Sequence, residues 1–174
     1  VFTSTTYASR SGTTDSNGQV TFTLADGSYR FRADINGRQY FSGTDNTCTT
    51  PGCASDTITV PVFGTVSVTV LDSTGAPQAG LNVYAFTGTT YTGASSITGS
   101  DGTALITLPQ GDYRFRADTH NHQYFSSTAN HCSVPSCTSA AITVPVFGSV
   151  TVSVASSGGL PQAGLNVYAF NDTT

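Results

Sequence analysis

Residues 113–118 read Tyr-Arg-Phe-Arg-Ala-Asp, and the same six residues stand at 29–34. Apolar and charged side chains alternate along this stretch. Because successive side chains of a β-strand point to opposite faces of a sheet, the aromatic residues and Ala117 share one face, and the arginines and Asp118 share the other. We expect a strand with its aromatic face buried and its arginine face solvated.

The duplicated stretch belongs to a repeat that runs through the whole chain. Further segments recur at the same offset of 84 positions, without insertion or deletion: Cys48 and Cys53 recur as Cys132 and Cys137, 58–64 as 142–148, and 77–84 as 161–168. A period of this length suits a small sandwich domain, whereas solenoid repeats are shorter. The chain begins and ends at equivalent points of the repeat. We therefore expect a partial repeat at 1–61 that lacks its first strands, a complete repeat at 62–145, and the first strands of a third repeat at 146–174.

The composition favours an all-β fold. Glu, Lys and Met, which are strong helix formers, are absent, while Thr, Ser, Gly and Val are abundant. In the complete repeat, alternation and turn residues predict seven strands, with a Thr- and Gly-rich loop before the third and an Asp-Gly hairpin turn after it. These strands are 65–71, 81–86, 95–98, 103–108, 112–118, 123–126 and 140–144. The prediction is a tandem array of seven-stranded Ig-like or prealbumin-like β-sandwiches with an 84-residue period.

The junction between repeats is short, apolar and contains proline. Pro61 and Phe63 occupy it after the first repeat, and Pro145 and Phe147 occupy it after the second. Such a junction is stiffer than a Gly/Ser linker, and we expect the two phenylalanines to pack between adjacent domains. The sequence therefore predicts a fairly rigid rod.

The order of motifs resembles that of the carboxypeptidase regulatory-like and Cna B-type domains of bacterial surface proteins. The residues that carry the resemblance are Gly64 to Val70, then Asp72, Gly75, Pro77, Gly80 and Val83, then 101–104 and 108–113. The resemblance implies a prealbumin-like or Ig-like sandwich and a role as stalk, spacer or adhesin module. Many Cna B-type domains contain a Lys–Asn or Lys–Asp isopeptide bond. That bond cannot form within these residues, because the sequence contains no Lys.

The four cysteines predict one short disulfide loop in each repeat, Cys48–Cys53 and Cys132–Cys137. Closing so short a loop stabilises a fold by about 2 kcal/mol. Disulfides also indicate an oxidising compartment, so we expect an extracellular or cell-surface location. A zinc site is the alternative, because His131 precedes Cys132, but Thr47 replaces that histidine in the first repeat. We expect no metal and no cofactor.

Other classes of site receive little support. The sequence has no Gly-x-Ser-x-Gly motif and its three histidines lie in one repeat, so we expect no catalytic residues. Asp15, Asp72 and Asp101 could bind calcium, but their positions in turns are explained by local Asx-turn hydrogen bonds. The net charge of −4 with no basic stripe argues against nucleic acid as a partner. No apolar run approaches the roughly 20 residues that span a bilayer.

Three functions remain open from the sequence. The favoured one is an extracellular structural protein, a filament, fibre or stalk whose partners are copies of itself. The copies could follow one another in one long chain, or separate subunits could dock so that residues from Val146 onward complete the partial repeat at 1–61. The alternatives are an adhesin that binds a glycan or cell-surface partner and a spacer domain of a larger secreted enzyme. The sequon Asn171-Asp172-Thr173 also allows N-glycosylation.

Overall fold

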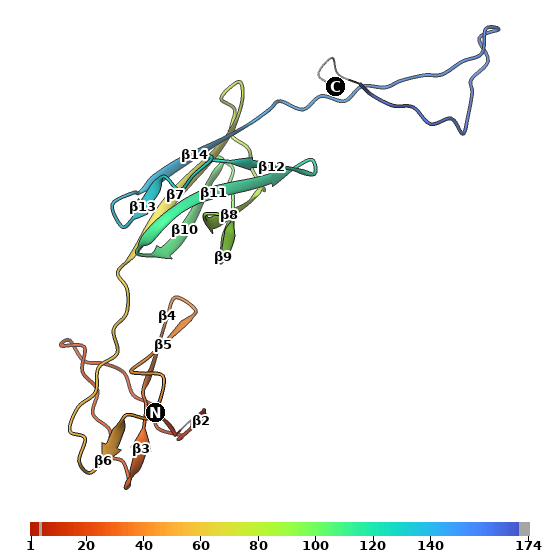
Figure 1. The fold of residues 1–174 in the computed structure, drawn as a ribbon. Coiled ribbons are helices and arrows are strands. Elements are labelled where there is room, and N and C mark those ends of the chain that lie inside the picture. Colours follow the sequence, from red (N-terminus) through yellow and green to blue (C-terminus); the bar gives the residue numbers. More distant parts are fainter. Residues whose placement is uncertain (4, 171–174) are drawn as a thin grey trace. The chain divides into compact units, whose positions relative to one another are not determined.

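The computed structural model describes residues 1–3 and 5–170, so the sequon at 171–173 lies outside the described residues (Figure 1). These residues form strands, turns and loops, and they include no helix that could cross a membrane. The described chain divides into two units, residues 1–144 and the residues from 145 onward. The fold is all-β, consistent with an Ig-like sandwich.

Residues 63–144 form the sandwich from two sheets (Figure 1). In the first sheet β7 (Phe63–Asp72) lies between β10 (Thr103–Pro109) and β14 (Ser139–Val144). The second sheet has the order β12 (His122–Phe125), β11 (Gly111–Thr119), β8 (Asn82–Thr87) and β9 (Thr90–Ile97), and β13 (Cys132–Val134) also pairs with β11. β7 runs antiparallel to β10 and parallel to β14. Among the described strands, β7 alone pairs with both β10 and β14.

The core lies between the two sheets and follows the predicted alternation. Val66, Val68 and Val70 are fully buried on β7, and Phe115 is fully buried on β11. Burying an aliphatic or aromatic side chain of this size stabilises a fold by about 1.5–3 kcal/mol. The inner face of β7 is thus a main source of stability for the sandwich.

The complete repeat has eight strands in the described structure, so the prediction of seven was wrong. The additional strand is β13, a short segment that pairs with Gly111–Tyr113 of β11. The third strand was also predicted too short, since β9 begins at Thr90 inside the expected loop. It pairs with β8 through a register shift between Tyr84 and Phe86. An irregular strand of Thr, Ser and Gly gives almost no apolar alternation to detect.

Residues 1–61 form three separate strand pairs. These are β1 (Phe2–Thr3) with β2 (Thr6–Tyr7), β3 (Gly27–Tyr29) with β6 (Cys48–Thr50), and β4 (Arg32–Ile35) with β5 (Arg38–Phe41). At the 84-residue offset they correspond to parts of β8–β9, β11–β13 and β11–β12. Residues 19–25 and 55–60, which align with β10 and β14, form no strand. No residue of 1–61 aligns with β7, the strand that β10 and β14 share.

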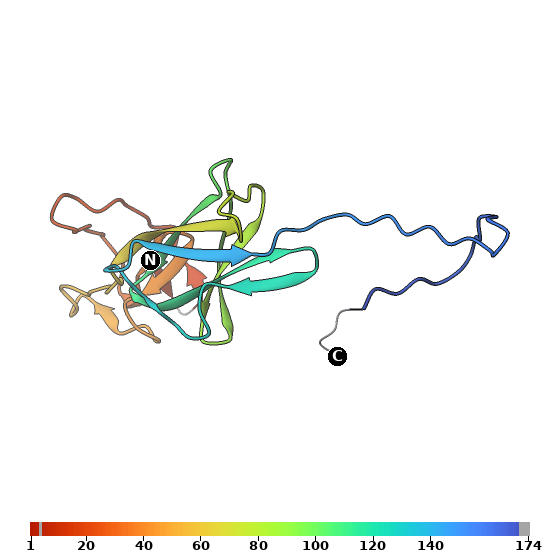
Figure 2. The ribbon, with the colours of Figure 1, turned by 90° about the horizontal axis from the view of Figure 1, so that it is seen from above.

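Residues 145–170 form an extended trace with one tight turn (Figures 1 and 2). In that turn the amide of Gln162 donates to the Val154 carbonyl, and the amide of Ser156 donates to the Leu160 carbonyl, both at 2.9 Å. Gln78 and Asp72 make the same bonds to Val70 and Ala76 between β7 and β8, again at 2.9 Å. The turn between the first two strands of the repeat is therefore already formed here.

Candidate functional site

The largest set of exposed apolar side chains in the described residues lies in 145–170. Val150, Val152 and Val167 are 86%, 61% and 54% exposed. Their counterparts 84 positions earlier, Val66, Val68 and Val83, are 0% exposed on β7 and β8. The same sequence pattern thus forms core strands in one place and an uncovered, extended segment without strand pairing in the other.

A second apolar surface lies on residues 1–61. Val20 and Val60 are 38% and 40% exposed, whereas their counterparts Ala104 and Val144 are each 1% exposed. Ile58 is half-buried, and its counterpart on β14 is buried. These residues align with β10 and β14, the two strands that pack beside β7. We call residues 19–25 and 55–60 the open edges of the first repeat.

Each repeat contains a local disulfide, Cys48–Cys53 and Cys132–Cys137, with Cα atoms 5.2 Å apart in both. The predicted pairing is confirmed. A backbone hydrogen bond closes each loop as well. The Cys53 amide donates to the Thr49 carbonyl, and the Cys137 amide donates to the Ser133 carbonyl, both at 2.7 Å. Sulfur atoms bonded to each other are not thiolate ligands, so these cysteines do not form the zinc site that we considered. Disulfides are compatible with an extracellular or secreted protein.

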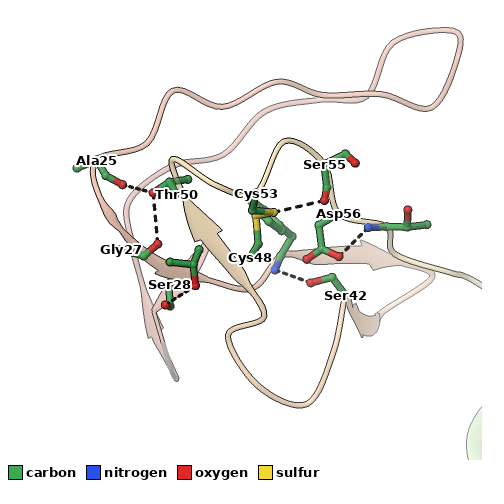
Figure 3. The surroundings of a disulfide bond; sticks show 12 residues. Ala25, Gly27, Ser28, Ser42, Cys48, Thr50, Cys53, Ser55 and Asp56 are labelled. Carbon is green, nitrogen blue, oxygen red and sulfur yellow. Dashed lines mark hydrogen bonds between the residues drawn. A yellow bond between two sulfur atoms is a disulfide. The ribbon is translucent and has the colours of Figure 1, made fainter.

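The first disulfide loop is attached to β3 by hydroxyl groups (Figure 3). The Thr50 hydroxyl donates to the Gly27 carbonyl at 3.3 Å, and the hydroxyls of Ser28 and Thr49 lie 2.8 Å apart. Cys48 itself is buried. The disulfide thus joins the start of β6 to the turn that follows it, and the hydroxyl bonds hold β6 against β3.

Arginine side chains stack on aromatic rings on the outer face of the second sheet. The Arg116 guanidinium lies 5.0 Å from the centroid of the Tyr84 ring and 4.8 Å from that of Phe86. Arg114 lies 4.4 Å from the centroid of Phe125. Stacking of this kind contributes about 0.5–2 kcal/mol for each pair. The predicted arginine face is therefore only partly solvated: Arg114 and Arg116 are half-buried, because Arg114 covers Phe125 and Arg116 covers Tyr84 and Phe86.

The same stack recurs in residues 1–61. Arg32 lies 4.9 Å from the Phe2 ring centroid, and Arg30 lies 4.6 Å from that of Phe41. In each repeat the second arginine pairs with an aspartate two residues later, Arg32 with Asp34 and Arg116 with Asp118, both at 2.8 Å. Because arginine–aromatic stacking occurs at equivalent positions in both repeats, it is a structural feature of the repeat.

These features can be compared with known families. Residues 65–146 match the carboxypeptidase regulatory-like domain family. The match extends from β7 to just beyond β14, and the resemblance found in the sequence is thereby confirmed for this segment. No curated protein matches the chain in sequence.

Within the segment that matches this family, Ser126 and His131 form a pair that sequence reasoning missed. The Ser126 hydroxyl oxygen lies 2.7 Å from His131 Nε2, and it accepts the Phe115 amide at 2.9 Å. Ser42 accepts the Phe31 amide in the same way at 3.1 Å, where Thr47 stands in place of the histidine. In both repeats the serine hydroxyl thus accepts a backbone amide of the neighbouring segment. Both serines end a Tyr-Phe-Ser motif, at 40–42 and 124–126, and this motif could have identified them from the sequence.

The turn aspartates bind the backbone, as the Asx-turn interpretation predicts. Asp72 Oδ1 accepts the hydroxyl of Thr74 at 2.6 Å and the amide of Ala76 at 3.0 Å, and these bonds lower the pKa of Asp72. The amides of Gln19 and Asn17 likewise lower the pKa of Asp15. Asp101 accepts the Thr103 amide at 3.0 Å. Each carboxylate therefore has a structural partner.

The four proposed junction residues lie at or just beyond the ends of the segment that matches the carboxypeptidase regulatory-like domain family. Phe63 begins β7 opposite Pro109 and is half-buried, and Pro61 precedes it. Pro145 directly follows β14, and Phe147 is 39% exposed. Packing of the two phenylalanines between adjacent domains stays a prediction.

Proposed function

We propose that this chain is a structural module of an extracellular filament, fibre or cell-surface stalk built from tandem sandwiches. The observation that carries the proposal is the alternating apolar segment at 149–156, which exposes Val150 and Val152 and follows β14 after only a short proline-containing segment. Its alternation is that of β7, the central strand of the sandwich. A segment of this kind belongs in the core of a neighbouring sandwich, so each repeat leads directly into the next.

The covalent and electrostatic features of each repeat suit a structural role outside the cell. A local disulfide fixes the end of one strand, and an arginine–aromatic stack covers the outer face of one sheet. Neither feature depends on a bound ligand. The partners in this proposal are copies of the same repeat, and the chain itself carries out no catalysis.

Electron microscopy of the secreted native material tests the proposal. We expect long uniform fibres with one regular spacing between domains. Isolated globules would contradict it. Saturable binding of the isolated chain to a glycan array, together with globules, would instead support an adhesin.

A further inference from the structure

We infer that residues 148–168 of one copy dock onto the open edges of residues 1–61 of a second copy and there form the first two strands of its sandwich. The inference rests on the proposed function, since it names the partner and the pairing by which modules would associate. In a longer chain with the same repeat, the preceding repeat would present this segment in the same register.

The acceptor surface is defined by the place of β7 in the complete repeat. There, β10 and β14 do not pair with each other, and each pairs with β7. Residues 19–25 and 55–60 align with these two strands, form no strand of their own and expose Val20 and Val60. Backbone that has no strand partner and lies beside exposed apolar side chains can pair with an added strand.

The complete repeat also supplies the register of docking. Val68 lies opposite Ala104, and Val66 lies opposite Ile106, in the antiparallel pair. At the 84-residue offset, Val152 of one copy lies opposite Val20 of the other, and Val150 lies opposite Phe22.

The parallel pairing of β7 with β14 predicts the contacts of the docked segment with residues 55–60 in the same way. Val70 lies beside Ile142 in the complete repeat, which places Val154 beside Ile58. A shift of one residue would turn these valines to solvent, so burial of the apolar face selects this register.

The far end of the docked segment is fixed by residues that are already in place. The amide of Phe2 donates to the Arg30 carbonyl at 2.8 Å, and the amide of Arg30 donates back at 3.0 Å. Phe86 pairs with Arg114 at the equivalent position in the complete repeat. Val1 and Phe2 thus occupy the places of Ala85 and Phe86, and the incoming segment ends at Tyr168, the counterpart of Tyr84. There Arg32 would lie over the Tyr168 ring, as Arg116 lies over Tyr84.

The donor segment is partly organised for docking. Its turn at 154–162 has the same backbone hydrogen bonds as the turn at 70–78 between β7 and β8. A segment that already has its bound conformation loses less conformational entropy when it binds. The exposed side chains of Val150 and Val152 supply the apolar surface to be buried.

A pair of complementary variants tests the docking. Val152→Asp places a charge on the inner face of the donor segment, and Phe22→Asp does the same on the acceptor, so each variant alone should lose self-association. Their equimolar mixture has one intact donor and one intact acceptor. In sedimentation experiments we expect the wild type to form a concentration-dependent series of oligomers, and the mixture to form a complex of twice the 17.9 kDa chain and nothing larger.

Ser149→Asp is the matched control, because its counterpart Thr65 is exposed on β7. This variant should associate like the wild type. A wild-type chain that stays at 17.9 kDa at every concentration would overturn the inference, and so would a mixture that forms no complex.

Cysteine cross-linking tests the register. Directly opposed residues of antiparallel strands have Cα atoms about 4.5–5.5 Å apart, which a disulfide can bridge. A Val20→Cys chain mixed with a Val152→Cys chain should form a covalent dimer on mild oxidation. A Val20→Cys chain mixed with a Ser153→Cys chain should not, since position 153 faces away. Equal cross-linking of both mixtures would overturn the register.

The results also separate this inference from the proposed function. Native fibres combined with a wild-type chain that never self-associates would leave the filament proposal standing and overturn only the docking. Docking in solution combined with globular native material would support the docking and contradict the filament.

Discussion

Gly102 shows how a single residue sets a turn of the sandwich. Its φ is +73°, and a Cβ atom added there would lie 2.6 Å from the Val70 carbonyl oxygen and 3.0 Å from the Gln78 amide nitrogen. Both contacts are to backbone atoms of the neighbouring β7–β8 turn, which cannot move without breaking the bond from the Val70 amide to the Gly102 carbonyl, 2.8 Å long. The Asp-Gly pair predicted from sequence is therefore required by both its conformation and its packing.

We predict that Gly102→Ala lowers the free energy of unfolding of the sandwich by roughly 2–5 kcal/mol, from left-handed backbone strain and steric overlap together. Gly75→Ala is the matched control, because Gly75 has a φ of +90° with nothing within 4 Å of an added Cβ. It should lose only about 1–2 kcal/mol through strain. Urea unfolding of both variants measures the difference, and equal losses would contradict the role of the Val70 contact.

The arginine stack marks a limit of prediction from single residues. The alternation of Tyr113, Phe115 and Ala117 correctly placed them in the core. The same alternation placed Arg116 on the outer face but did not predict that it is half-buried there, because Tyr84 and Phe86, on which it stacks, come from a neighbouring strand. The pattern of one strand does not say which side chains lie opposite on the next.

At the scale of elements, the strands with strong apolar alternation were predictable, and the polar or short ones were not. β13 has three residues and precedes a proline, so its sequence is typical of a loop. It becomes a strand because it pairs with the start of β11, and the disulfide at Cys132 joins it to the following turn. Pairing with a neighbour, not intrinsic propensity, decides such a segment.

We predict that replacing Cys132 and Cys137 together by Ala lowers the free energy of unfolding of the sandwich by about 2 kcal/mol, the contribution of so short a closed loop. Alanine is preferred to serine because Cys132 is fully buried. Urea unfolding followed by circular dichroism measures the effect.

The control is the same double replacement at Cys48 and Cys53. That loop lies in the partial repeat, so its loss should leave the main cooperative transition of residues 63–144 unchanged. An equal loss in both variants would show that the two repeats unfold as one unit.

At the scale of the whole molecule, the same residues have different structures in different surroundings. Residues 58–60 and 142–144 are both Ile-Thr-Val. The second set lies in β14 with its isoleucine and valine buried, and the first forms no strand. The same three residues form a strand where they pair with β7 and none where no such strand lies beside them, so the sequence alone predicts only where a strand can form.

Hydrogen exchange of the dilute chain measures this dependence directly. We predict that amides of β10 and β14 exchange on the order of a thousandfold more slowly than those at 19–25 and 55–60, because the former open only with the stable sandwich. A synthetic peptide with the sequence of residues 146–168 should slow exchange at 19–25 and 55–60 and leave β10 unchanged. The same peptide with Asp in place of Val150 and Val152 is the control and should protect neither edge. Strong protection of 19–25 without any peptide, or equal protection by the two peptides, would show that the open edges do not need an added strand.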